Sequence, residues 1–214
     1  AFWLHTEISM QSDIKDWNEK LNDKEKNLVG NILLGFAQTE CAVSDYWTQK
    51  VVGWFPKHEI QQMAMMFGSQ ETIHAVAYSY LNETLKLEDY EAFLHEPGQQ
   101  MKWSVRDESL HSKMGCQLFR HMCEEDDQLL NLCREDIIKS AETMVTLETK
   151  YINKMFEMGD IEGIAANDLK HFIKKRANEK LVELGYVDLG SYFAYDTKAA
   201  ANLDWFYHLT GGVT

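Results

Sequence analysis

The sequence contains few residues that would interrupt a helix. Proline occurs only twice in 214 residues, at Pro56 and Pro97, and no stretch rich in glycine, serine or proline has the composition of a linker. The ten methionines and the long stretches bearing Leu, Lys, Glu and Ala favour helices over strands. The absence of a linker predicts a single domain over residues 1–214 rather than two small ones.

Paired cysteines are also missing. The chain has four cysteines, and no two of them form a Cys-x-x-Cys motif. All lie in helix-like sequence, so we interpret them as small buried side chains of a protein in a reducing compartment, not as disulfides or zinc ligands. They are Cys41, Cys116, Cys123 and Cys133.

The sequence has neither a basic stripe nor a long apolar run. Its formal net charge is −13, which argues against nucleic acid as a partner. No signal peptide opens the sequence, and no apolar run approaches the ~18 residues of a membrane span, so we expect a cytoplasmic protein without a membrane partner. Most of the surplus acid is expected on a solvated surface, and only acids on apolar helix faces are candidate cation ligands.

Helical periodicity covers most of the chain and predicts an all-α fold. Asp23 is expected to cap the N-terminus of the first long helix. From Tyr186 the sequence is aromatic and irregular, and no convincing strand pair is present. Antiparallel helical bundles can carry metal sites in their cores. The predicted helices span residues 28–51, 58–84, 99–123, 128–158 and 166–184.

Two Glu-x-x-His segments stand out, Glu71 with His74 and Glu108 with His111. Residues three apart on a helix share a face, so each pair presents a carboxylate and an imidazole to the same point. Two such helices facing each other can hold two metal ions. The first pair lies in a nearly apolar segment, where a charged Glu is costly unless it is paired or metal-bound. We therefore predict metal ligation, with satisfied polar residues of a core as the alternative.

Glu40 is a further candidate, because it is the only acid in the apolar stretch 33–43. It is either a ligand from another helix or a partner in an interhelical hydrogen bond. A fourth helix with a carboxylate is not found. Only 33 residues separate His74 from Glu108, and Asp107 among them belongs to the Glu108 helix. The other acids there lie at a helix end or in a polar connection.

Five segments match, in chain order, the motifs of one known family. They are residues 2–8, with Phe-Trp followed by Glu-Ile; 71–79, with E-x-x-H-x-x-x-Y-S; 103–111, with R-D-E-x-L-H; 172–181, with A-N-x-x-L; and 202–206, with N-L-D-W-F, which lacks the family's proline. Together they resemble the small, radical-generating (beta) subunit of class I ribonucleotide reductase. The resemblance implies a ferritin-like helical bundle with a di-metal carboxylate core.

The resemblance also implies a set of metal ligands. Glu40 matches the first ligand, where many members of the family have Asp. Glu71 with His74 matches one metal position, and Glu108 with His111 matches the other. The implied cofactor is a pair of iron ions, although manganese or a mixed pair suits oxygen and imidazole ligands as well.

Tyr78 matches the radical-bearing tyrosine of the family. It follows Glu71 and His74 at i+7 and i+4, so the helix places it beside the metals. Trp3, Asp107 and His74 match the family's electron-transfer chain toward the large subunit, and a metal-bound His often donates its second N–H to a carboxylate. Without the resemblance, Tyr78 would pass for a core aromatic with a satisfied hydroxyl, and Trp3 for an ordinary core tryptophan.

The implied function is that of the small subunit of ribonucleoside-diphosphate reductase. Such a subunit activates oxygen at its metals and stores an oxidising equivalent, which a large subunit uses to reduce ribonucleotides to deoxyribonucleotides. A homodimer is expected, and the nucleotide substrate should not bind this chain. The alternatives are another ferritin-like di-metal oxidase, an iron-storage protein or a metal-free binding protein. An oxidase or iron-storage protein would not need the chain from Trp3 to Asp107.

One part of the family pattern is missing. The family has two further helices, with the remaining glutamate ligand, at the position between Pro97 and Gly98, and a C-terminal tail that docks on the large subunit. We expect that this chain is incomplete internally and at both termini; a true deletion, which leaves five of six ligands, is the alternative. Converging acids without cations repel one another, so a chain without these helices is expected to have an empty or partly occupied site.

Overall fold

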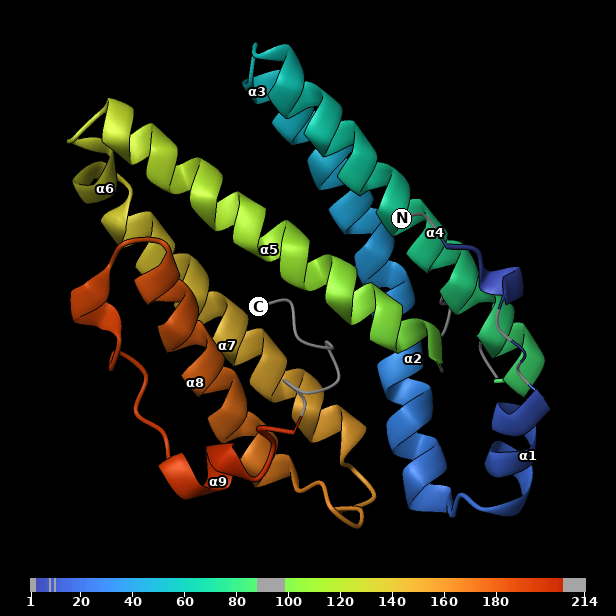
Figure 1. Ribbon diagram of the computed structural model, residues 1–214. Helices are drawn as coiled ribbons and strands as arrows, with labels where there is room; N and C mark the ends of the chain where they lie inside the picture. Colours follow the sequence, from blue (N-terminus) through green and yellow to red (C-terminus); the bar gives the residue numbers. More distant parts are fainter. Residues whose placement is uncertain (1–2, 8, 10, 88–98, 206–214) are drawn as a thin grey trace. The chain divides into compact units, whose positions relative to one another are not determined.

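The computed structural model describes residues 3–7, 9, 11–87 and 99–205 (Figure 1). The chain divides into two compact units, Ala1–Asp107 and Glu108–Thr214. The described residues form helices and one isolated bridge, between Ile161 and Ile164, with no strand. The predicted all-α fold is therefore confirmed. The junction of Pro97 with Gly98 lies outside the described residues, and the single domain stays a prediction.

In the first unit, two long antiparallel helices, α2 and α4, pack against each other (Figure 1). They correspond to the predicted helices 28–51 and 58–84, and Pro56 lies in the connection before α4. The last turns of the first predicted helix are a π-helix, η2. The elements are η1 (His5–Glu7), α1 (Gln11–Glu19), α2 (Asp23–Asp45), η2 (Tyr46–Val51), α3 (Val52–Trp54), α4 (His58–Leu85) and the start of α5 (Gln99–Glu125).

The start of α2 corrects one prediction, because Asn22 and not Asp23 is the N-cap. The Asn22 side chain accepts hydrogen bonds from the backbone N–H groups of Lys24 and Glu25, at 3.0 and 3.1 Å. The Glu25 carboxylate in turn accepts from the Asn22 N–H at 2.8 Å. This reciprocal pair is a capping box, which satisfies more of the free N–H groups than a cap at Asp23 would. Asp23 still favours the helix start through its negative charge.

The buried side of α2 corrects the prediction about cysteines. Leu33, Glu40 and Trp47, which are seven residues apart, are all buried and define the inward stripe of the helix and its π-helical extension. Cys41 is rotated about 100° from Glu40 and is exposed. The other three cysteines are only half-buried, so the expected full burial is wrong. All four thiols are free.

In the second unit, α7 and α8 lie side by side (Figure 1). The core forms where the segment after α8 packs back on the helices, around buried Leu181, Tyr186 and Leu189. The predicted helix 128–158 is divided at Cys133 into α6 and α7. The elements after α5 are α6 (Leu129–Leu132), α7 (Arg134–Met155), α8 (Ala166–Glu183), η4 (Val187–Leu189) and α9 (Thr197–Ala201).

Two buried polar groups hold the segment that follows α8. The Asn178 side chain donates to the Phe193 carbonyl at 3.0 Å and accepts from the Phe193 N–H at 2.9 Å. The Tyr186 hydroxyl donates to the Leu130 carbonyl at 2.8 Å. These bonds satisfy backbone groups that burial would otherwise penalise. The A-N-x-x-L segment thus anchors the chain at Phe193.

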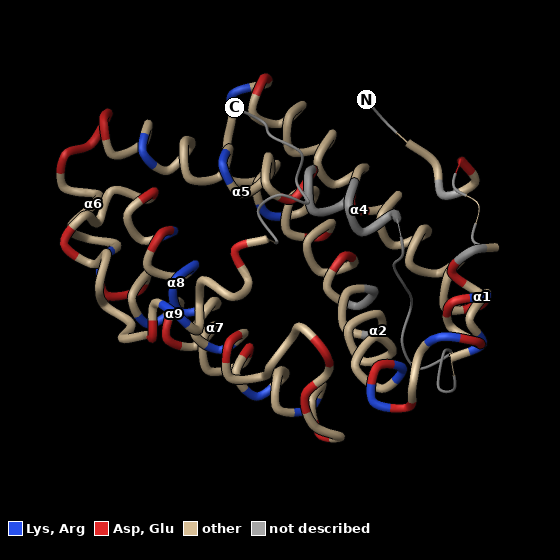
Figure 2. The backbone as a smooth tube through the Cα atoms, turned by 60° about the horizontal axis from the view of Figure 1, so that its bottom comes forward, with Lys and Arg blue, Asp and Glu red and all other residues tan. Residues whose placement is uncertain are grey.

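Charged residues lie on the helices of both units, and the acidic segment 124–127 closes α5 (Figure 2). In the second unit, Arg134 pairs with Asp188 and lies 5.6 Å from the centroid of the Tyr186 ring. Its hydrogen bond to Asp188 lowers the pKa of that carboxyl. The contribution of this pair to stability is therefore present above the unfolded-state pKa and is lost as the pH falls through the folded-state value. No described helix is long and apolar enough to span a membrane.

We predict that Asn178→Ala lowers the free energy of unfolding by about 2 kcal/mol, because it leaves both backbone groups of Phe193 without their partner in a partly buried site. Urea unfolding measures this. Asn202→Ala is the matched control, since it removes one exposed hydrogen bond to Asp168 and should cost less than about 0.5 kcal/mol. Equal losses in the two variants would contradict the anchoring role.

Candidate metal centre

Helix α4 brings three predicted site residues to one buried face. Glu71, His74 and Tyr78 follow one another at spacings of three and four, and their exposed fractions are 0, 0 and 2%. Side chains at these spacings lie above one another on a helix. Glu40 comes from the facing helix α2 and is 5% exposed. The first unit therefore collects two acids and an imidazole from two helices in its interior.

His74 lies at the centre of this group. Its Nδ1 is 3.0 Å from a Glu71 carboxylate oxygen and 3.6 Å from a Glu40 carboxylate oxygen. One ligand atom from each of the three residues lies within 4.8 Å of the others. Carboxylate oxygens with imidazole nitrogen suit iron and manganese. Because buried carboxylates repel one another, a divalent cation between them would relieve the repulsion.

The other ring nitrogen of His74 faces a third acid. Its Nε2 is 3.2 Å from Asp107 Oδ2, and the same oxygen accepts a hydrogen bond from Trp3 Nε1 at 3.1 Å. The Trp3 and His74 rings also stack, with centroids 5.7 Å apart and planes 24° apart. With a cation bound at the two glutamates, His74 would carry its proton on Nε2 and donate it to Asp107, and the Nδ1 lone pair would face the metal. A metal-binding His has this arrangement.

Trp3 and Asp107 are both buried, at 6 and 5% exposure. Three residues that are far apart in the sequence therefore form one continuous contact from Trp3 through Asp107 to His74. In this hydrogen-bonded path the Asp107 carboxylate bridges the Trp3 indole and the His74 imidazole, whose rings are also stacked. The structure thus brings together the three residues predicted for electron transfer, although their role stays a prediction.

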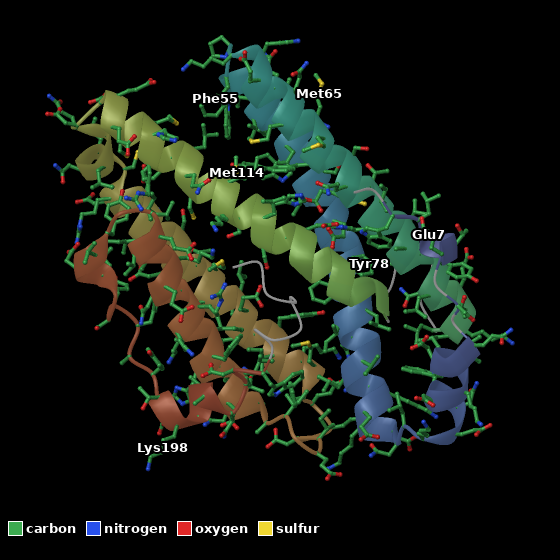
Figure 3. The ribbon with its side chains drawn as sticks, in the orientation of Figure 1. Glu7, Phe55, Met65, Tyr78, Met114 and Lys198 are labelled. Atoms are coloured by element: carbon green, nitrogen blue, oxygen red, sulfur yellow. The ribbon has the colours of Figure 1, made fainter. Side chains whose placement is uncertain are left out.

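Tyr78 extends from α4 one turn beyond His74 (Figure 3). Its ring stacks on Phe36 of α2, with centroids 5.9 Å apart and planes 17° apart. The packing keeps the phenol out of water, since only 2% of the residue is exposed. A dry environment is what a reactive tyrosine would need, because water admits side reactions.

The second Glu-x-x-His pair lies on the part of α5 that belongs to the second unit. Glu108 follows directly after Asp107, and its carboxylate is 3.5 Å from Nδ1 of His111. His111 is buried at 3% exposure, whereas Glu108 is half-buried. The pair thus presents a carboxylate and an imidazole together, as its spacing predicts. Its part in a shared centre stays a prediction.

A family model described as "Ribonucleotide reductase, small chain" matches residues 1–97 and 90–190 of this chain. The chain belongs to the ribonucleotide reductase small chain family. The family consists of oxidoreductase subunits, and the resemblance found in the sequence motifs is thereby confirmed. The possible metal ligands at Glu40, Glu71 and His74 agree with a family expected to carry a carboxylate-rich centre.

Curated relatives carry the same family name. Two proteins that are named probable ribonucleoside-diphosphate reductase small subunits, from Invertebrate iridescent virus 3 and Invertebrate iridescent virus 6, are 24% and 23% identical to this chain. Their alignments cover 89% and 95% of this chain, and 71% and 82% of those proteins. A small chain from Neurospora crassa is 31% identical over 46% of this chain and 22% of its own length.

A solved structure confirms the fold of this small chain. A crystal structure from Bacillus halodurans, named as a class I ribonucleotide reductase, matches with a TM-score of 0.77 and 17% sequence identity. The match covers 97% of this chain and 95% of that one. The ferritin-like helical fold is therefore confirmed.

The alignment with the iridescent virus 3 protein also indicates that this chain lacks a segment that the viral protein has. It spans 267 positions, whereas this chain has only 214 residues in all. This chain therefore lacks residues that the relative has. The location of the missing segment between Pro97 and Gly98 stays a prediction.

Sequence reasoning missed two side chains near the centre of this small chain. Gln70, four residues before His74, lines a narrow space beside Trp3 and Asp107. Asn82, four residues after Tyr78, is 0% exposed, and neither polar atom of its side chain has a hydrogen-bond partner within the described residues. The sequence could have indicated both residues, because each lies four positions from a predicted site residue and therefore on the helix face that carries the site.

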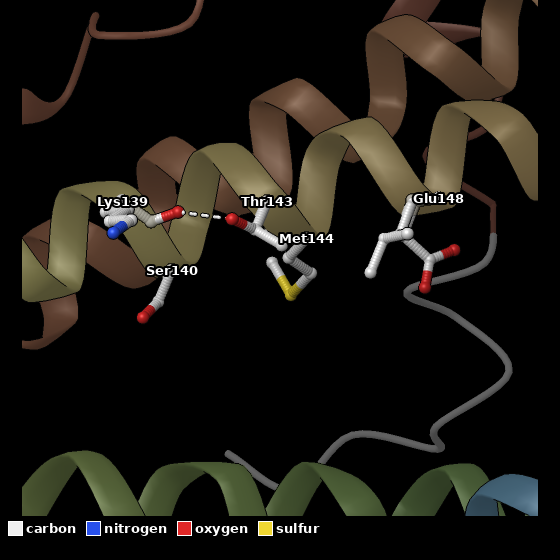
Figure 4. Close-up of a pocket in the computed structure, with 6 residues that line it drawn as sticks. Lys139, Ser140, Thr143, Met144 and Glu148 are labelled. Carbon is white, nitrogen blue, oxygen red and sulfur yellow. Dashed lines mark hydrogen bonds between the residues drawn. The ribbon is translucent and has the colours of Figure 1, made fainter.

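A shallow hollow along α7 contains none of the predicted site residues (Figure 4). Its lining comes from one exposed helix face, on which Thr143 donates a hydrogen bond to the Lys139 carbonyl at 2.8 Å. Partial desolvation raises the pKa of Glu148 at one end of the hollow. The lining has no converging set of metal-binding donor atoms, so this hollow is not a candidate metal site. The lining residues are Lys139, Ser140, Thr143, Met144, Leu147 and Glu148.

We predict that Asp107→Ala weakens Mn²⁺ binding by about 10–100-fold, because His74 loses the acceptor that fixes its ring orientation and tautomer. Isothermal titration measures the affinity. Glu59→Ala removes one acid from the exposed first turn of α4 and serves as the control for net charge. Unchanged affinity in Asp107→Ala, with the control also unchanged, would show that Asp107 does not orient His74.

Proposed function

We propose that this chain is the radical-generating small subunit of a class I ribonucleoside-diphosphate reductase. The observation that carries the proposal is the buried contact from Trp3 through Asp107 to His74, which ends at the acids Glu40 and Glu71. A storage protein needs acids and imidazoles but no aromatic side chain coupled to them. A subunit that exports an oxidising equivalent needs both.

The proposed metal centre takes its ligands from α2, α4 and α5. Glu40, Glu71 and His74 converge in the first unit, and Glu108 with His111 are the further ligands that the family motifs imply. When bound, two iron or manganese ions would supply the oxidising power by reacting with oxygen. The protein holds the donor atoms in place and excludes water. The proposed ligands are Glu40, Glu71, His74, Glu108 and His111.

One glutamate ligand of the family pattern has no counterpart in this sequence. We propose that it belongs to the segment missing between Pro97 and Gly98, and the greater length of the viral alignment supports this. A chain without this segment would bind its metals more weakly, because fewer acids would neutralise the two cations. The affinity of a chain that includes it should be correspondingly higher.

Tyr78 is the proposed site of the stored oxidising equivalent. Its ring would give up one electron to the metals when they are bound, and its hydroxyl proton would pass to the oxygen reduced there; the burial of Tyr78 keeps water from the resulting radical. The equivalent then leaves through His74, Asp107 and Trp3. In this step Asp107 holds the Trp3 N–H and the His74 N–H at one oxygen atom.

The proposed partners follow from this role. The chain would work as a homodimer with a large catalytic subunit that binds the ribonucleotide, in the cytoplasm, where its four free thiols stay reduced. Neither nucleic acid nor a membrane is a proposed partner.

Metal analysis with electron paramagnetic resonance tests the proposal on the full chain after reconstitution with Fe²⁺ under air. We expect metal uptake and a tyrosyl signal. Tyr78→Phe should keep the metal and lose the signal, whereas Tyr80→Phe, at an exposed position of the same helix, should keep both.

The other outcomes assign the alternatives. Uptake of many iron ions per chain without a radical would indicate storage. Iron oxidation that persists unchanged in both variants, again without a radical, would indicate another di-metal oxidase. The absence of any metal uptake would indicate a metal-free binding protein.

A further inference from the structure

Helices α2 and α4 touch one turn away from the candidate ligands. Ser44 lies four residues after Glu40, and Gly68 lies three residues before Glu71. These separations correspond to about 6 and 4.5 Å along the respective helix axes. Whatever fixes the distance between Ser44 and Gly68 also limits the distance between the two glutamates. The contact was not predicted from the sequence.

A hydrogen bond joins the two helices at this point. The Ser44 hydroxyl donates to the Gly68 carbonyl at 3.0 Å, across 24 residues of sequence. The Thr72 hydroxyl, next to Glu71, donates to the same carbonyl at 3.1 Å. One backbone oxygen therefore receives a side chain from each helix. This bond fixes the axial register of α2 against α4 beside the ligands.

Close packing reinforces the hydrogen bond. A Cβ atom at Gly68 would lie 2.3 Å from Cγ2 of Thr48, a distance that real Cβ contacts essentially never show. The next contacts, to the Ser44 carbonyl oxygen at 3.4 Å and to Cβ of Thr48 at 3.6 Å, are ordinary. The absence of a side chain at Gly68 thus allows the approach, and a single methyl group of Thr48 sets its limit.

The π-helix η2 holds Thr48 in place. The Thr48 hydroxyl donates to the Ser44 carbonyl at 2.8 Å. One residue earlier, buried Trp47 packs edge-to-face against Phe67, with centroids 5.0 Å apart and planes 77° apart. Since Phe67 precedes Gly68, both sides of the contact are anchored. π-helical segments occur often beside functional sites.

We propose that Ser44, Thr48 and Gly68 form an interhelical clasp that positions Glu40 and Glu71 for the metal. They act as positioning residues and donate no ligand atom. The inference rests on the proposed function, because it assumes that a metal binds at these glutamates. A small change in helix separation moves a carboxylate out of the narrow range of metal–ligand distances, so the clasp controls affinity.

Titration of Mn²⁺ into the full chain tests the clasp. Gly68→Ala should lower the affinity by about 10–100-fold, comparable to the loss of an outer partner of a metal ligand. Gly53→Ala is the matched control, because a Cβ at Gly53 would meet no atom within 4 Å, and its affinity should equal that of the parent. Ser44→Ala should lower the affinity by about 2–10-fold, the equivalent of one hydrogen bond.

The double variant Gly68→Ala/Thr48→Ser provides a rescue. Serine at position 48 removes the clashing methyl group and keeps the hydroxyl, so Mn²⁺ affinity should return to within about threefold of the parent. A variant that is merely destabilised would bind metal normally once folded. Near-ultraviolet circular dichroism of each sample reports the folded state, and should Gly68→Ala not fold, the double variant and Ser44→Ala decide the question.

The results separate the two proposals. A parent chain that binds no Mn²⁺ contradicts the proposed function. A parent chain that binds Mn²⁺ while Gly68→Ala and Ser44→Ala bind it equally well contradicts the clasp alone. Reduced binding in Gly68→Ala that Thr48→Ser does not restore also contradicts it.

Discussion

The structure of the candidate site depends on the orientation of one buried imidazole, whose two nitrogens face different acids. His74 faces Glu40 and Glu71 with Nδ1 and Asp107 with Nε2. Because a neutral imidazole carries one proton, donation from Nε2 to Asp107 would leave the lone pair of Nδ1 to bind a cation. The same aspartate oxygen accepts from Trp3, so the ring orientation and the path out of the site are fixed together.

This arrangement is costly unless the helices hold it firmly. Glu71 and His74 have no exposed surface, and buried charges are tolerated only with compensating partners. The antiparallel pair α2 and α4 brings Glu40 opposite His74 and beside Glu71, so a cation held between the two carboxylates would supply the compensation. The contact of Ser44 with Gly68 fixes the two helices one turn away. The packing of α2 against α4 therefore determines both the stability of the helix pair and the geometry of the candidate site.

The sequence sufficed for features that depend on local spacing. Glu71, His74 and Tyr78 share a face because a helix repeats every 3.6 residues, and few helix breakers made the all-α fold predictable. For α2 the sequence identified Glu40 as a candidate but did not show that the inward face of the helix excludes Cys41. Cys41 looked apolar and is exposed, because the inward stripe of α2 passes through Glu40 instead.

Tertiary packing explains the remaining differences. The close approach at Gly68 depends on Thr48, twenty residues earlier on another element, and no local pattern reports it. The pairing of Trp3 with Asp107 joins residues 104 positions apart, and only the family motifs suggested it in advance. The cap at Asn22 was missed because Asp23 is also an acceptable cap, and the reciprocal bond from Glu25 decides between them.

The most direct test is anomalous diffraction from crystals of the full chain grown with Mn²⁺. The account predicts a manganese peak bonded to Nδ1 of His74 and to carboxylate oxygens of Glu40 and Glu71, with Nε2 of His74 still hydrogen-bonded to Asp107. A peak on Nε2, or manganese bound elsewhere while these three residues contact only one another, would contradict it.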